Sequence, residues 1–202
     1  MKIALIGASG NVGSRVAAEL SSRGHSVTGI ARNASKIAEL RGVTPVTQDI
    51  ADTKALAEVL KGHDVVISSV HFLDSNPDQL IAAVKAAGVH RYLVVGGAGS
   101  LEVAPGVRLI DSPDFPAEYK PETAAGCAFL DRLRQENELE WTFQSPSFNF
   151  SPGKRTGKFR LGTDSLLSNS DGSNISMEDF AIAMVDEIEA PKHVRARFTV
   201  GY

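Results

Sequence analysis

Three glycines at intervals of three residues, Gly7, Gly10 and Gly13, constrain the fold of this chain more than any other feature. The apolar, β-branched run before them, residues 3–6, predicts a buried strand. After them, residues 12–23 carry apolar side chains on one helical face. A strand, a glycine turn and a helix in this order are typical of the phosphate-binding unit of a dinucleotide fold.

Each glycine has its own task in such a unit. Gly7 turns the backbone off the strand, Gly10 lets it approach a pyrophosphate, and Gly13 lets the helix lie close to the sheet. The N–H groups at the positive end of the helix would hold the phosphates, and they belong to Ser9, Gly10, Asn11 and Val12. The spacing is G-x-x-G-x-x-G rather than G-x-G-x-x-G, and three glycines alone also suit a structural turn. The flanking strand and helix favour the nucleotide.

Further strands and helices alternate along the first two thirds of the chain. We expect strands at residues 26–31, 43–47, 64–70, 92–95 and 140–144, and helices at residues 35–40, 53–60, 77–87 and 119–136. This alternation requires right-handed crossovers and predicts an α/β, Rossmann-type, doubly wound parallel sheet. The long connection at residues 98–118 has no clear period, so we interpret it as a lid over the site.

The pattern changes after Pro146. We expect one NAD(P)-binding domain over residues 1–202, with residues 147–178 as a small appended hairpin and loop region for the substrate. Residues 158–161 and 165–169 suit a hairpin, a capping box at Ser176 opens a helix, and residues 197–200 suit an edge strand.

Arg32 stands at the end of the second predicted strand, where NAD-specific folds carry an acid. A guanidinium there would pair with a 2′-phosphate, with Asn33 as a further donor, so we favour NADP(H) over NAD(H). The alternative is a solvated arginine. After the third strand, Asp49 would accept from the adenine amino group with Ile50 against the ring, although Asp49 also suits a helix cap.

Ligands of this fold lie beyond the carboxyl ends of the strands. The remaining expected cofactor residues are therefore those at the ends of the fourth, fifth and sixth strands, namely Ser68, Ser69, Val70, Gly96, Gly97 and Pro146. Small residues there let a nicotinamide ring lie flat.

Charge and cysteine content exclude several classes of function. The net charge is -3 with a pI near 6.0, so no basic field attracts nucleic acid, and no apolar run suits a membrane span. The single cysteine, Cys127, is expected to be a packing residue rather than a nucleophile. Because one cysteine cannot form an intramolecular disulfide and the first strand begins at residue 2, we expect a cytoplasmic location. We expect no metal, a small-molecule substrate, and a monomer or homodimer.

The chain resembles the atypical short-chain dehydrogenase/reductases, in particular their NmrA-like and NAD(P)H-flavin-reductase branch. The matching stretches are residues 7–13, 94–100, 141–146, 152–162 and 197–202. The resemblance implies a Rossmann domain that binds NADP(H) or NAD(H), with a small C-terminal substrate region and reductase activity.

One departure from that family bears on the chemistry. Typical members use Tyr-x-x-x-Lys, whose one-turn spacing lowers the pKa of the phenol. Here Tyr92 is followed four residues later by Gly96, and Tyr119 by Thr123. A proton relay to an alcohol or ketone is therefore poorly supported.

An acceptor that needs little acid catalysis, such as FMN, another flavin or a quinone, escapes this problem. We therefore expect an NADP(H)-dependent oxidoreductase that passes hydride to a flavin or quinone-like molecule. Tyr119 and His71 are the candidate catalytic residues, with Phe148 and Phe150 as aromatic surface. The alternatives are a non-catalytic NADP(H)-binding redox sensor and an ordinary dehydrogenase or epimerase.

A basic segment at residues 154–160 carries four cations, Lys154, Arg155, Lys158 and Arg160. Because it follows the sixth strand, we hypothesise that Arg155 or Lys158 rims the cleft and attracts the phosphate of FMN. The alternative is a solvated surface hairpin.

Overall fold

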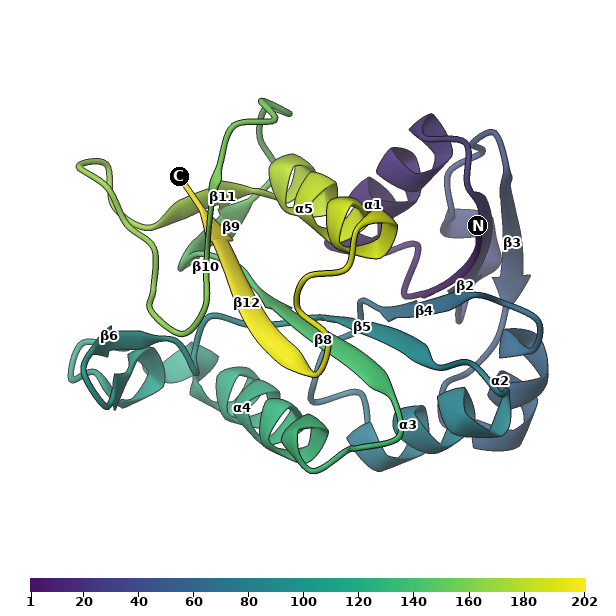
Figure 1. Ribbon diagram of the computed structural model, residues 1–202, viewed down its shortest axis with the longest axis horizontal. Coiled ribbons are helices and arrows are strands. Elements are labelled where there is room, and N and C mark those ends of the chain that lie inside the picture. The colour runs from purple at the N-terminus through teal and green to yellow at the C-terminus, as the bar shows by residue number, and fades with distance from the viewer.

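The computed structural model describes residues 1–202 and shows one twisted sheet with helices on both faces (Figure 1). The strands of this sheet, in spatial order, are β10 (Arg160–Gly162), β12 (Ala196–Gly201), β8 (Glu140–Ser145), β5 (Arg91–Val95), β4 (Val65–Ser68), β1 (Lys2–Ile6), β2 (Ser26–Ala31) and β3 (Val43–Thr47). All neighbouring strands are parallel except β10 and β12. The predicted Rossmann-type doubly wound sheet is confirmed.

The helices form two layers (Figure 1). Helices α1 (Asn11–Ser22) and α5 (Met177–Glu189) cover one face, and α2 (Thr53–Leu60), α3 (Pro77–Ala86) and α4 (Lys120–Arg134) cover the other. Successive strand residues point to opposite faces, so Ile3 and Leu5 pack under α1 and α5 while Ala4 and Ile6 pack against the second layer. Apolar residues on both faces are what a covered parallel strand requires. No helix has both the length and the apolar composition needed to cross a bilayer.

The C-terminal strands differ from the prediction. The expected edge strand at residues 197–200 lies inside the sheet as β12, between β8 and β10, and the short β10 is the edge. Arg197 of this strand is buried, and its guanidinium pairs with Asp164 and donates to the Ser100 hydroxyl.

The expected hairpin of residues 158–161 with 165–169 is also wrong, because β10 pairs with β12 instead. Residue 165 forms only an isolated bridge, to Glu102. Two segments that the sequence pattern did not mark, β9 (Asn149–Ser151) and β11 (Asn174–Ser176), pair in parallel as a small separate sheet.

The long connection after β5 is more ordered than predicted. It contains the strands β6 (Glu102–Ala104) and β7 (Val107–Arg108), which pair across a turn at Gly106, whose φ is 74°. Short 3-10 turns follow at Leu109–Asp111 and Ala117–Tyr119. The helix expected at residues 35–40 is only a 3-10 turn at Ala34–Lys36.

Candidate active site

The glycine turn lies where the strand order reverses, between β1 and β4. Gly7 has a φ of 83°, and a Cβ there would lie 2.0 Å from the carbonyl oxygen of Ser69. A Cβ on Gly13 would lie 2.1 Å from the carbonyl oxygen of Gly7. These two glycines are therefore required by the protein's own packing.

Gly10 is different, because a Cβ there would meet only the Gly7 carbonyl oxygen, at 3.3 Å. Its free side faces a groove, and no side chain caps the start of α1. The first N–H groups of a helix have no partner within the helix. The turn therefore offers unpaired donors and the positive end of a helix dipole beside an open space, which suits a pyrophosphate.

The groove in front of this turn has a volume of about 460 Å³. Most of the predicted cofactor residues line it, namely Gly7, Ser9, Gly10, Asn11, Val12, Arg32, Asp49, Ile50, Ser69, Val70 and Gly96. Residues from the ends of β1, β2, β3, β4 and β5 thus meet along one channel, as the sheet topology requires.

Arg32 and Asp49 face this groove from β2 and β3. Arg32 is exposed and makes no hydrogen bond or ion pair with another residue, so its guanidinium is available to an anion. One carboxylate oxygen of Asp49 accepts from the Ala51 N–H at 3.0 Å. The cap of α2 is Asp52 instead, which accepts from the Ala55 N–H. The other oxygen of Asp49 is left for a ligand.

Some predicted cofactor residues lie elsewhere. Ser68 does not line the groove: it is buried, and its hydroxyl bonds to the hydroxyl of Tyr92 at 2.9 Å. Asn33 caps the turn after β2, where its side-chain oxygen accepts from the N–H and hydroxyl of Ser35. Gly97 and Pro146 line a second cavity.

This second cavity has a volume of about 760 Å³ and continues the groove. The two spaces share four wall residues, Phe72, Gly96, Glu122 and Phe150. Further walls come from the loop after β5, the start of α4 and the segment after β8; they include Gly97, Gly99, Leu109, Phe115, Tyr119, Thr123, Gly126, Cys127, Pro146 and Phe148. The loop expected to be a lid thus contributes Leu109 and Phe115 to this wall.

The cavity is mostly apolar, and Glu122 is the one charged residue in its wall. Arg197 and Arg108 lie farther out, and each is paired with an aspartate. Burial raises the pKa of the Cys127 thiol above its usual value. Cys127 is therefore a packing residue of the wall rather than an activated nucleophile, as the sequence predicts.

The two candidate catalytic residues lie on opposite sides of Glu122. Tyr119 is 58% exposed and belongs to the cavity wall, whereas His71 belongs to the groove. The Nδ1 atom of His71 lies 3.4 Å from a carboxylate oxygen of Glu122. Thr123 stands one helical turn beyond Tyr119. This helix therefore places no lysine ammonium beside the phenol of Tyr119.

Phe72 and Glu122 are the residues that sequence reasoning missed. The ring of Phe72 stacks on Phe143 at 6.1 Å between centroids and meets Phe129 edge to face at 5.5 Å. A Cβ on Gly126 would lie 2.9 Å from this ring. A glycine inside the helical pattern was the available signal, because it marks a close approach.

Glu122 fixes the backbone next to that ring. Its two carboxylate oxygens accept from the N–H groups of Phe72 at 2.7 Å and Leu73 at 3.0 Å. The carboxylate therefore ties α4 to the loop after β4, and it places a negative charge at the junction of groove and cavity.

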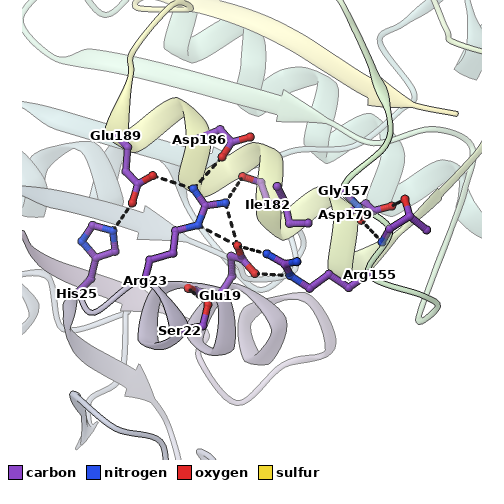
Figure 2. A network of polar contacts seen from close by, with 11 residues as sticks. Glu19, Ser22, Arg23, His25, Arg155, Gly157, Asp179, Ile182, Asp186 and Glu189 are labelled. Carbon is purple, nitrogen blue, oxygen red and sulfur yellow. Dashed lines mark hydrogen bonds and ion pairs between the residues drawn. The ribbon is translucent and has the colours of Figure 1, made fainter.

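The basic segment does not face this site, and the FMN-phosphate hypothesis for Arg155 is wrong. Figure 2 shows Arg155 directed at Glu19 of α1, which it contacts through two hydrogen bonds of 2.9 Å. Arg23 binds the same carboxylate and also Asp186 and Glu189 of α5. Arg155 thus ties the basic segment to α1, and Arg23 ties α1 to α5.

The same network perturbs Glu19 clearly. Hydrogen bonds from Arg155, and then from Arg23, hold the pKa of the Glu19 carboxyl below its usual value, although burial acts in the opposite direction. Lys158, also proposed to attract the phosphate, is absent from both the groove and the cavity walls.

Comparison with known proteins agrees with this geometry. Residues 7–191 match the NAD(P)H-binding family, and the chain belongs to that family. The fold and the glycine turn define the same class, a Rossmann-type protein that binds a dinucleotide.

Three relatives span nearly all of this chain. YwnB of Bacillus subtilis (strain 168) is 43% identical over 211 residues, 99% of this chain and 98% of YwnB. A protein of Streptococcus pneumoniae TIGR4 named a "putative NADH-flavin reductase" is 36% identical, with a TM-score of 0.84 over 100% of this chain and 99% of that one. NAD(P)H azoreductase of Xenophilus azovorans is 28% identical over 213 residues, 98% of this chain and 67% of the azoreductase.

Proposed function

We propose that this protein is an NADP(H)-dependent oxidoreductase that passes hydride to a planar aromatic acceptor of the flavin or quinone type. The observation that carries the proposal is the junction of the two spaces: a groove that suits a dinucleotide opens, past Phe72 and Gly96, into an aromatic-walled cavity. A donor ring in one space and an acceptor ring in the other would meet at this junction.

The residues of the groove fit the dinucleotide. The unpaired N–H groups at the start of α1 would bind the pyrophosphate, and the open side of Gly10 leaves room for it. Arg32 would pair with a 2′-phosphate, and Asp49 with Ile50 would hold the adenine. This assignment gives NADP(H) the preference over NAD(H).

A bound NADPH would supply the hydride, and the residues of the protein would hold the donor and acceptor rings in position. Phe72 is held by two aromatic neighbours, so its ring would form a fixed surface at the edge of the junction where donor and acceptor meet. Gly96 places no side chain at the junction, and packing requires a glycine there, since a Cβ would lie 2.3 Å from the Phe143 ring. Holding two rings face to face accelerates a transfer that needs no strong acid.

The acceptor cavity agrees with this assignment. Its wall consists largely of aromatic residues and of small residues such as glycine and serine, which suits a flat conjugated ring system. Tyr119 at the rim and His71 beside Glu122 are the titratable groups from which the reduced acceptor would take its proton. The names of the Streptococcus pneumoniae and Xenophilus azovorans relatives, a flavin reductase and an azoreductase, denote acceptors of this chemical class.

One observation favours a second function, a redox sensor that binds NADP(H) without turnover. No ammonium stands one turn after Tyr119, where the related dehydrogenases have their lysine. One assay distinguishes the reductase from the redox sensor.

The assay is steady-state oxidation of NADPH with lumiflavin, riboflavin and a simple naphthoquinone, alongside calorimetry of NADPH binding. The Gly10→Val variant is the control for cofactor-independent reactions. Turnover with at least one acceptor supports the reductase. Tight NADPH binding without turnover of any acceptor would overturn it and favour the sensor.

A further inference from the structure

We infer that Glu122 makes the acceptor cavity select uncharged or cationic acceptors and reject anionic ones. The inference rests on the proposed function and narrows its substrate class. Glu122 is the one charged residue among those that wall the cavity. It faces both the groove and the cavity, so any acceptor that reaches the donor must approach this carboxylate.

The charge of Glu122 is fixed in place. Both oxygens accept from backbone N–H groups, those of Phe72 and Leu73, and acceptance on both oxygens is what an ionised carboxylate provides. Its side chain is 35% exposed, so the carboxylate is partly shielded from water by the apolar wall. In such surroundings like charges repel more strongly than in bulk water.

No cation in the wall offsets this carboxylate. Arg197 contacts the wall residue Ser100 but is neutralised by Asp164. Arg108 on the neighbouring hairpin is neutralised by Asp111. His71 is the nearest titratable base, and its side chain is 82% exposed on the groove side. An anionic acceptor therefore meets one carboxylate and no free positive charge.

Riboflavin and FMN test the inference because they share a ring system and differ by a phosphate. Two like charges about 10 Å apart at an effective dielectric constant of about 20 lower binding by about tenfold. We therefore expect the wild-type protein, saturated with NADP⁺, to bind riboflavin about tenfold more tightly than FMN, measured by quenching of flavin fluorescence. The kcat/KM for riboflavin should exceed that for FMN by a similar factor.

The variant Glu122→Gln removes the charge and keeps one accepting oxygen for the loop. We expect it to lower the preference for riboflavin to about threefold or less. Glu118→Gln is the matched control, since it removes an exposed carboxylate that lies in the 3-10 turn just before the same helix and does not line the cavity. Its preference should equal that of the wild type. Circular dichroism melting checks that both variants fold.

The outcomes separate the two proposals. If the binding preference falls in Glu122→Gln alone but neither a flavin nor the naphthoquinone is reduced, the selectivity holds and the reductase function fails. If the wild type binds FMN as tightly as riboflavin, or if both variants keep the same preference, Glu122 does not select by charge. If neither flavin binds, the charge selectivity is overturned, and the reductase proposal then stands or falls with turnover of the naphthoquinone.

Discussion

Replacing Gly10 by valine should abolish cofactor binding while leaving the fold intact. The backbone angles of Gly10, a φ of -77° and a ψ of 171°, are extended values that valine adopts readily. Its Cβ would meet only the carbonyl oxygen of Gly7, at 3.3 Å. The added methyl groups would instead fill the space in front of the helix N-terminus, where the pyrophosphate is expected.

The magnitudes follow from these contacts. A valine at the start of α1 is a poor cap and should cost about 0.5–1 kcal/mol, which lowers the melting temperature by a few degrees. Blocking two charge-assisted hydrogen bonds to the pyrophosphate, worth about 1.5–3 kcal/mol each, should raise the Kd of NADPH by at least about 100-fold. Calorimetry and thermal melts of the same preparation measure both effects.

Gly13→Ala is the control with the opposite outcome. Its Cβ would lie 2.1 Å from the carbonyl oxygen of Gly7, inside the protein. Such overpacking costs about 1–3 kcal/mol or more, so we expect a melting temperature lower by up to about 10 °C. A Gly10→Val protein that binds NADPH with the wild-type Kd would refute the placement of the pyrophosphate.

Further variants test the groove and the α1–α5 network. Arg32→Ala should weaken NADPH binding by about 1.5–3 kcal/mol and leave NADH binding unchanged in calorimetry; equal wild-type affinities for both cofactors would contradict this. Arg155→Ala should cost about 0.5–1 kcal/mol in chemical denaturation, because Arg155 is half exposed and Glu19 keeps its bond to Arg23, and should leave the KM values of FMN and riboflavin unchanged. Because the pKa of Glu19 is lowered in the folded state, its contribution is complete above the unfolded pKa near 4.5 and is lost as pH falls through the folded pKa. Melting temperatures from pH 7 to pH 3 should therefore fall less steeply in Glu19→Gln than in the wild type.

The N-terminal half of the fold was predictable because its signals are local. The bounds of β2, β3 and α2 agree with the sequence pattern to the residue. Each is marked by its own apolar period and by a turn residue at its end, and parallel strands covered on both faces leave little choice of partner. The groove followed from the same logic, since its residues are those that end the strands.

Which face a strand residue takes was harder to predict. Ser68 and Ser69 are neighbours at the end of β4, yet Ser69 lines the groove and Ser68 bonds to Tyr92 inside the protein. A period of two residues does not say which member of a pair faces the ligand. The order of β8, β12 and β10 was equally hidden, because a charged residue such as Arg197 makes an inner strand resemble an edge unless its partner, here Asp164, is known.

Helix α4 is packed closely at Thr123, the residue one turn after Tyr119. A Cβ on Gly99 would lie 1.9 Å from the methyl group of Thr123, so the loop after β5 rests directly on the helix at that residue. One turn farther, Gly126 makes room for the ring of Phe72. The space beside the acceptor is thus filled by a methyl group and a phenyl ring that bind no proton. Glu122 is the one charged residue of this wall, which therefore suits the positioning of a ring and discrimination by charge. For this reason we assign hydride transfer to an acceptor that needs little acid catalysis.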